Sequence, residues 1–147
     1  MRRLAPLAAV AGLAVFAGTA AADVRFEGRT SQGGYTLLVA EDDGVPKRSL
    51  IRWRADCRRP GVRLEESTGF SRPLDLSTRR RFRDAGSYRD REGRFRVTYT
   101  VRMSGRKVAS RRWAGRFRAR AVVRRAGRVV DRCSVRGVRW RVVRPAR

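Results

Sequence analysis

The sequence predicts an all-β domain, folded as a single antiparallel β-sandwich or a flattened β-barrel. The first observation is strict alternation over residues 94–103, where every second residue is apolar and those between are Arg or Thr. A period of two is typical of a half-buried strand. The second observation is that the pattern recurs before and after this segment, with turn residues between and no helical periodicity. Short strands at regular spacing favour a sandwich or barrel. The apolar positions of the central segment are Phe95, Val97, Tyr99, Val101 and Met103.

The first 22 residues have the parts of a secretory signal peptide. Arg2 and Arg3 form a basic start, residues 4–17 are apolar, and residues 20–22 are three alanines that fit an A-x-A cleavage site. An uncleaved membrane anchor is the alternative, because the apolar stretch approaches a spanning length. We expect cleavage after the third alanine, which leaves residues 23–147 as one secreted or envelope-associated β domain without a transmembrane segment.

The expected strands of the N-terminal half are residues 24–30, 35–40 and 50–57. A hairpin turn at Gln32-Gly33-Gly34 joins the first two. The acidic turn at residues 41–44 lacks the spacing of a calcium loop. In the second strand, Tyr35, Leu37 and Val39 share one face and Leu38 lies on the other. Side chains expected to point inward in the other two strands are Val24, Phe26, Ile51, Trp53, Ala55 and Cys57.

The segment from residue 62 to 88 is the least regular part of the chain. Its apolar residues are scattered among Ser, Pro, Thr and Arg, and residues 79–83 form the densest basic run. We interpret it as a long connection with one or two short strands. Residues 84–87 and 90–93 are expected to be turns on either side of Tyr88.

The C-terminal half is expected to continue the alternation. Residues 104–107 predict a turn, after which a strand returns from Val108 and Gly115 marks a bulge or a close backbone approach. A turn at residues 125–128 and a register shift at Arg136-Gly137 separate the last strands. Side chains expected in the core here are Phe117, Ala119, Ala121, Val123, Cys133, Val138, Trp140 and Val142.

The two cysteines, Cys57 and Cys133, predict a disulfide. An even count in an exported chain favours pairing, and the chain has neither a histidine nor a C-x-x-C motif that would suggest a metal site. The bridge would close a loop of about 75 residues, which stabilises the fold by roughly 4.5 kcal/mol in the chain-entropy model.

The chain is strongly basic, and almost all of its cations are arginine. Removal of Arg2 and Arg3 from the 37 basic residues leaves 35 against 13 acidic ones, a net charge of about +22, with Lys47 and Lys107 the only lysines. One interpretation is a polyanion partner, such as nucleic acid, an anionic cell-wall polymer or lipid headgroups. The other is codon bias in a GC-rich genome, which explains the choice of arginine over lysine better than it explains the excess.

Catalytic chemistry finds little support. The absence of histidine excludes Ser-His-Asp and Cys-His arrangements. Ser–Lys pairs are formally available at Ser49 with Lys47 and at Ser104 with Lys107, but in expected turns. The adjacent pair Glu65-Glu66 would point to opposite faces of a strand and could not cleave a glycoside together. We expect no catalytic residue, metal or cofactor, and keep a histidine-free hydrolase as an alternative.

A binding role is therefore the main expectation. The sequence predicts a non-catalytic secreted or envelope-associated binding or structural domain with an unknown ligand. The alternative is a polyanion-binding protein that uses an arginine-rich sheet face. The expected core position of the aromatic residues argues against base stacking, so anionic envelope polymers or lipid headgroups are better partners than nucleic acid. The candidate binding residues are Arg94, Arg96, Arg102, Arg118 and Arg120.

Several segments also carry a resemblance. They resemble exported β-rich proteins of unknown function from high-GC Gram-positive bacteria, over most of the mature chain, which implies export and a β fold without an activity. An immunoglobulin-like topology stays open, because Trp53 precedes Cys57 and Asp131 stands where such domains often have a tyrosine. The segments are Phe26-Glu27-Gly28-Arg29-Thr30-Ser31-Gln32-Gly33-Gly34, Ile51-Arg52-Trp53 before Cys57, Ala114-Gly115-Arg116-Phe117, and Cys133 followed by Val138-Arg139-Trp140.

Overall fold

The protein is an all-β molecule, as the alternation predicts. The computed structural model describes residues 22–41, 44–71, 75–78 and 80–146; the expected signal peptide up to residue 21 and residues 42–43 of the acidic turn lie outside this part. All regular elements of the described residues are strands, and all pair antiparallel. They are β1 (Val24–Thr30), β2 (Tyr35–Ala40), β3 (Pro46–Cys57), β4 (Arg63–Phe70), β5 (Asp75–Thr78), β6 (Arg81–Glu92), β7 (Phe95–Ala109), β8 (Arg112–Arg125) and β9 (Arg128–Val143).

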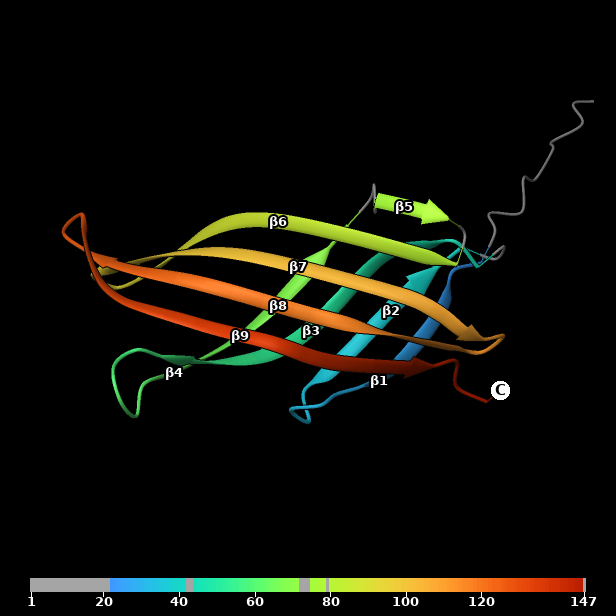
Figure 1. The fold of residues 1–147 in the computed structure, drawn as a ribbon. Coiled ribbons are helices and arrows are strands. Elements are labelled where there is room, and N and C mark those ends of the chain that lie inside the picture. Colours follow the sequence, from blue (N-terminus) through green and yellow to red (C-terminus); the bar gives the residue numbers. More distant parts are fainter. Residues whose placement is uncertain (1–21, 42–43, 72–74, 79, 147) are drawn as a thin grey trace, which may run out of the picture.

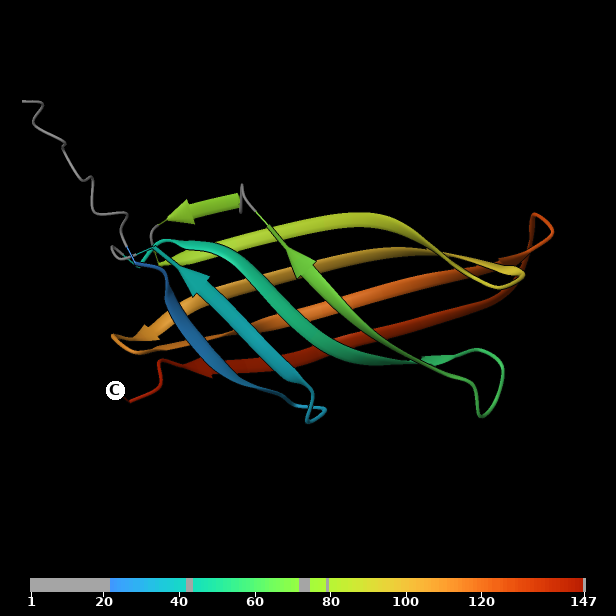
Figure 2. The same cartoon turned by 180° about the vertical axis from the view of Figure 1, so that it is seen from behind.

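The strands form two meanders that share one joint. The order across the sheet is β4-β3-β2-β1-β9-β8-β7-β6-β5, so each strand pairs with its sequence neighbour except across the β4–β5 connection, and β1 pairs with β9. The β1–β4 meander folds over the β6–β9 meander, and the two views from front and back show the strands of the two layers crossing (Figures 1 and 2). The topology that the sequence leaves open is thus an up-and-down sheet curled into a flattened barrel, open between β4 and β5.

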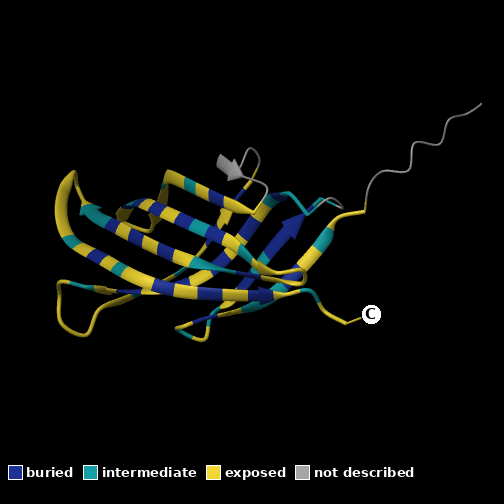
Figure 3. Cartoon of the chain, turned by 45° about the vertical axis from the view of Figure 1, so that its right-hand side comes forward, coloured by how far each residue is buried: buried dark blue, intermediate teal, exposed yellow. Residues whose placement is uncertain are grey.

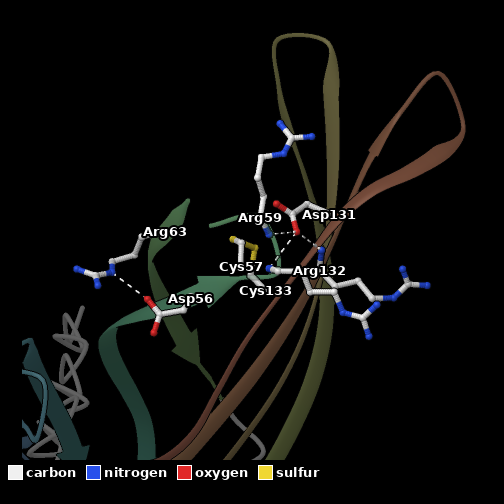
Figure 4. Close-up of a disulfide and its surroundings, with 8 residues drawn as sticks. Asp56, Cys57, Arg59, Arg63, Asp131, Arg132 and Cys133 are labelled. Atoms are coloured by element: carbon white, nitrogen blue, oxygen red, sulfur yellow. Dashed lines mark hydrogen bonds and ion pairs between the residues drawn. A yellow bond between two sulfur atoms is a disulfide. The ribbon is translucent and has the colours of Figure 1, made fainter. Parts of the chain in front are cut away.

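The joint extends beyond β1 because β3 is longer than the hairpin beside it. Next to the start of β2, the side-chain amide of Gln32 in the β1–β2 turn takes the place of a strand: its nitrogen donates to the Arg54 carbonyl and its oxygen accepts from the Arg54 N–H, both at 2.9 Å. The next residues of β3 then pair directly with β9, with Cys57 opposite Cys133. The predicted disulfide between these two is present at this point (Figure 4).

Alternation places a dry core between the two layers. Buried and exposed positions alternate along the long strands (Figure 3). Trp53, Tyr99 and Phe117 are each at most 1% exposed, and the Trp53 ring centroid lies 6.2 Å from that of Tyr99 and 5.6 Å from that of Phe117. These residues come from three different strands, so the expected common interior is confirmed. A second aromatic group, Phe82, Trp113 and Trp140, fills the other end of the core.

Two glycines make room for one tryptophan. Gly105 in β7 pairs with Gly115 in β8, which pairs with Trp140 in β9. A Cβ on Gly115 would lie 1.9 Å from the Ser104 carbonyl oxygen and 2.5 Å from the Trp140 ring, and one on Gly105 would lie 2.3 Å from the Phe82 ring. The close approach expected at Gly115 is therefore confirmed, and the indole of Trp140 occupies the space that the missing side chains leave.

The structure corrects three expectations about element boundaries. The segment 62–88 is not a loose connection, because it contains the long strands β4 and β6, and residues 84–87 lie inside β6. The expected turn at 104–107 is strand, because Gly105 serves the core and not a turn; β7 runs on to Ala109. Of the expected turn at 90–93, only Gly93 is in the turn, which it shares with Arg94.

Other local expectations hold. The expected register shift at Arg136-Gly137 is confirmed: the β8–β9 pairing jumps from Phe117–Val138 to Ala119–Val135, and Gly137 has φ +68°. In β2 the inner face is polar at one position, since fully buried Thr36 lies beside Leu38 and its hydroxyl donates to the Leu50 carbonyl at 3.1 Å.

The β8–β9 turn supplies a stability prediction. Ala126 has φ +47° and Gly127 has φ +78°, which is the backbone of a type I′ hairpin turn. A non-glycine residue in this left-handed region costs about 1 kcal/mol. Ala126→Gly should therefore raise the free energy of unfolding by roughly 0.5–1 kcal/mol in denaturant titrations. Ala114→Gly, near the start of β8, is the matched control and should lower the free energy of unfolding. Equal effects at both sites would contradict this explanation.

Candidate polyanion-binding face

The outer side of the β6–β9 layer is covered by arginine. Its outward positions follow from the strand registers, which alternate with the buried core positions. All members are exposed except Arg124, which is half-buried. We call this surface the arginine face; its members are Arg81, Arg83, Arg89, Arg91, Arg96, Arg102, Arg106, Arg112, Arg116, Arg118, Arg120, Arg124, Arg132, Arg139 and Arg141.

Four of the five candidate residues come together on this face. Arg96 and Arg102 lie on β7, and Arg118 and Arg120 lie on the neighbouring strand β8. The fifth, Arg94, is in the β6–β7 turn, at the end of the sheet. Four of the remaining arginines lie on β6, a segment for which the sequence predicts a connection and turns, so they were not among the candidates.

Arginines of this face sit directly opposite one another on neighbouring strands. Like charges in such positions destabilise a sheet, because the side chains of a cross-strand pair are in contact distance. Arginines at these positions therefore weaken the fold unless an anion shares the charge between them. The facing pairs are Arg81–Arg106, Arg91–Arg96, Arg96–Arg124, Arg102–Arg118 and Arg116–Arg139.

The acidic residues of β6–β9 lie on the other side of the sheet from these arginines, whereas at the edge Arg83 lies opposite Asp75 of β5. By register, the acidic residues of β6–β9 point to the inner side: Asp84, Asp90, Glu92 and Asp131 pair with Met103, Val97, Phe95 and Val123. Asp84, Asp90 and Asp131 each accept a hydrogen bond from the next backbone N–H, at 2.6–2.7 Å. Among the described residues, none of the ion pairs involves a member of the arginine face.

The β1–β4 layer is different, although it belongs to the same chain. There the cations have acidic neighbours: Arg52 lies 3.5 Å from Glu65 and Arg63 lies 3.1 Å from Asp56. Near the start of β1, Asp23 pairs with Lys47 and with Arg48. A compositional bias toward arginine acts on both layers alike, so it does not explain why the ion pairs found among the described residues lie in the β1–β4 layer.

The arginine face contains an open depression of about 1040 Å³ across β6–β9. The hydroxyls of Thr100 and Ser104 lie among its arginines, and Asp84 is the acidic residue at its lining. The guanidinium group has a planar set of donors that suits phosphate, sulfate and carboxylate oxygens. The depression thus offers several anion-binding donors to one ligand; its arginines are Arg83, Arg102, Arg116, Arg118, Arg120 and Arg136.

The residues considered for catalysis have other partners. Lys47 pairs with Asp23, and the buried Ser49 hydroxyl contacts the Met103 sulfur at 3.3 Å. Glu65 and Glu66 pair with Arg54 and Trp53 of β3, and so point to opposite faces as expected. Within the described ranges, no three Asp, Glu or Cys side chains are grouped as metal ligands would be.

A polar network ties the open edge of the barrel. The Trp53 indole N–H donates to Thr68 Oγ1 at 2.9 Å, and this hydroxyl also hydrogen-bonds the Tyr88 hydroxyl at 2.9 Å. Tyr88 stacks on Tyr99 with ring centroids 4.7 Å apart. Burial, followed by the nearby Glu66 carboxylate, raises the pKa of Tyr99. The network is a structural closure between β3, β4 and β6, on the inner side of the sheet.

Tyr99 predicts how stability depends on alkaline pH. Its hydroxyl is buried without a hydrogen-bond partner among the described residues, and its raised pKa means that the unfolded chain ionises first. The contribution of Tyr99 to the free energy of unfolding is therefore fully present below about pH 10. It falls as the pH rises above this value, by up to about 1.4 kcal/mol per pH unit. Tyr99→Phe should make this decline shallower, with little change at pH 7. Denaturant titrations from about pH 9 to about pH 12, which bracket the usual tyrosine pKa, are the measurement. Tyr35→Phe, at an exposed site, is the control and should leave the decline as it is.

Comparison with known proteins does not add a relative to this picture. No family model, curated protein or solved structure matches the chain. The resemblance to exported Gram-positive proteins therefore stays a prediction. In the part of the chain that the structure describes, we find no helix with the length and hydropathy needed to cross a membrane.

Proposed function

We propose that the protein is a non-catalytic binding domain that holds an anionic polymer on its arginine face. The observation that carries this proposal is the set of directly facing arginines on the outer side of β6–β9, while the acidic residues of these four strands lie on the inner side. An anion that bridges two such side chains removes the repulsion and satisfies several donors at once. The central depression is where the ligand would make most of its contacts.

The expected compartment favours a polymer of the cell envelope or extracellular space as the ligand. The Cys57–Cys133 disulfide fits an oxidising environment, and the first 22 residues have the pattern of a cleaved signal peptide. The outward positions of β6–β9 contain no aromatic residue, so the face lacks the stacking platform typical of single-strand nucleic-acid binders. Recognition would therefore depend on charge and spacing.

The test is retention of residues 23–147 on immobilised heparin over a series of salt concentrations. A polyanion-binding face predicts a steep linear fall of the logarithm of affinity with the logarithm of salt, since bound counterions are released. Flat, weak retention would contradict the proposal and leave codon bias as the origin of the arginines.

A double charge reversal at the depression should weaken this retention. Each lost ionic contact lowers the salt exponent by about 0.7–0.9, so Arg118→Glu with Arg120→Glu should lower it by roughly 1.4–1.8. The matched control is Arg25→Glu with Arg52→Glu, which changes the net charge equally on the β1–β4 layer. Equal losses for both doubles would show that net charge, and not this face, causes retention.

A stability measurement on the same charge-reversed variant distinguishes weaker binding from a folding defect. Arg118 faces Arg102, so Arg118→Glu replaces a repulsive cross-strand pair by an attractive one. The charge-reversed protein should unfold at the same or a higher denaturant concentration while it binds more weakly. Loss of both stability and retention would contradict a role in binding.

A further inference from the structure

Apolar side chains are exposed at the end of the sheet where the β6–β7 and β8–β9 turns lie. The two views show these turns together at one end of the molecule (Figures 1 and 2). Phe95 is 40% exposed, Val129 40% and Val130 37%. The sequence predicts that Phe95 lies in the core, and this prediction is wrong. Its position in β7 has inward parity, but the opposite layer does not extend far enough to cover it. We call this region the hairpin end, defined by Phe95, Val129, Val130 and the two turns.

Arginines surround these apolar residues. A second open depression at the hairpin end is lined by arginines of both turns, together with Ala126 and Gly127. Arg125 lies opposite Phe95 on one side and Arg128 on the other. The acidic residues of β6–β9 at this end, Asp90, Glu92 and Asp131, are fewer than its arginines. The lining arginines are Arg91, Arg94, Arg96, Arg124 and Arg125.

A third loop is held at the same end. Residues 58–62 connect β3 to β4, and Asp131 of β9 accepts hydrogen bonds from the backbone N–H groups of Arg58 at 3.1 Å and Arg59 at 3.4 Å (Figure 4). This loop carries Val62, which is 40% exposed, beside its two arginines. The hairpin end thus combines exposed apolar side chains with cations on three loops.

We propose that the hairpin end docks on a membrane surface that contains anionic lipids. Arginine binds lipid phosphate groups, and apolar side chains on the same end enter the boundary between headgroups and acyl chains. An anionic polymer would have no use for Phe95, Val129 and Val130. A second copy of this chain would bring arginine against arginine. A lipid surface satisfies both features, since it presents negative charge above an apolar layer.

The hairpin end is separate from the central depression, although it shares Arg91, Arg96 and Arg124 with the arginine face. The protein would stand with the long axes of β6–β9 directed away from the bilayer, because the turns between these strands make the contact. This orientation leaves the central depression open to the aqueous side. The chain could therefore hold an anionic polymer next to a membrane.

The experiment is co-sedimentation of residues 23–147 with vesicles of phosphatidylcholine alone or mixed with phosphatidylglycerol. We expect binding to the mixed vesicles only. Phe95→Ser with Val130→Ser should weaken it about tenfold, through loss of apolar area buried in the interface. Val108→Ser is the matched control, because Val108 is 44% exposed near the opposite end of β7 and should have no effect.

Heparin retention of the same variants distinguishes this proposal from the previous one. Unchanged retention of the Phe95/Val130 double variant, with weakened vesicle binding, supports a separate lipid contact. Vesicle binding equal to that of the unmodified protein overturns the proposal, as does failure of the unmodified protein to bind mixed vesicles. A dimer in solution that the double variant dissociates would also overturn it, in favour of a contact between copies.

Discussion

Replacement of both cysteines by alanine is expected to lower the free energy of unfolding by about 4.5 kcal/mol. Cys57 and Cys133 are 76 residues apart in sequence, so the bridge removes much conformational freedom from the unfolded chain. Removal of the disulfide should also weaken the folded state, because β3 and β9 pair over only two positions, Asp56–Ser134 and Cys57–Cys133. Denaturant titration with tryptophan fluorescence is a suitable measurement, since all three tryptophans are buried.

Two comparisons check the origin of this effect. The reduced unmodified protein should show nearly the same loss as the Cys57→Ala, Cys133→Ala protein. Ser134→Ala, at the neighbouring exposed position of the same pairing, should change stability by no more than about 0.5 kcal/mol. A loss below about 1 kcal/mol on removal of the bridge would mean that the unfolded chain is not restricted by it as the entropy model requires.

Gly115→Ala should destabilise the protein by about 3 kcal/mol or more. The added methyl group would overlap the Ser104 carbonyl oxygen and the Trp140 ring. The carbonyl is held in the β7–β8 pairing, so it cannot move without loss of hydrogen bonds on both strands. We expect a large fall in soluble yield and a lower unfolding midpoint in those molecules that fold.

Gly86→Ala is the matched control in the same layer. A Cβ there would meet nothing closer than Val101 Cγ2 at 3.9 Å, and alanine restricts the unfolded chain more than glycine does. The variant should be as stable as the unmodified protein or slightly more so. Similar losses at Gly86 and Gly115 would show that strand propensity, and not the space for Trp140, is what the glycines provide.

Alternation was enough to predict the central strands and their inner faces. β3, β7, β8 and β9 carry apolar residues at nearly every inward position, because they are covered by the opposite layer along most of their length. The disulfide could be predicted for a simpler reason, since the chain has two cysteines and the pattern of an exported protein. These features are local, and one periodicity or one pair decides them.

β6 shows why the rest was missed. Its inward positions include Asp84, Gly86 and Asp90 as well as Phe82 and Tyr88, so the hydrophobic period is interrupted. β6 lies near the open side of the barrel, where β5 covers only its beginning, and partly solvated inner positions tolerate polar residues. Without β6, its four arginines could not be added to the outer face, and the full extent of that face depends on the registers of four strands.

Phe95 was misplaced for a related reason. Parity in a strand gives the side on which a residue lies, but not whether the opposite layer reaches that far. Val97 is covered and Phe95, two residues earlier, is 40% exposed. The end of a core is set by the lengths of strands that are distant in sequence. In this protein, β3 and β4 do not extend over the start of β7, where Phe95 lies.

The central joint also determines the order in which the molecule can be completed. β9 hydrogen-bonds to β8, to β1 and to the end of β3, and in sequence it follows the other strands of the described residues. Each meander can form its hairpins from contacts close in sequence. The two meanders, in contrast, cannot be joined until β9 is present, and pairings between distant segments form slowly. The apolar inner side of β1–β4, with Phe26, Leu38 and Ile51, therefore stays exposed to water until β9 has joined the two meanders. The rate at which β9 pairs with β1 and β3 therefore determines how long the incompletely folded protein is prone to aggregate.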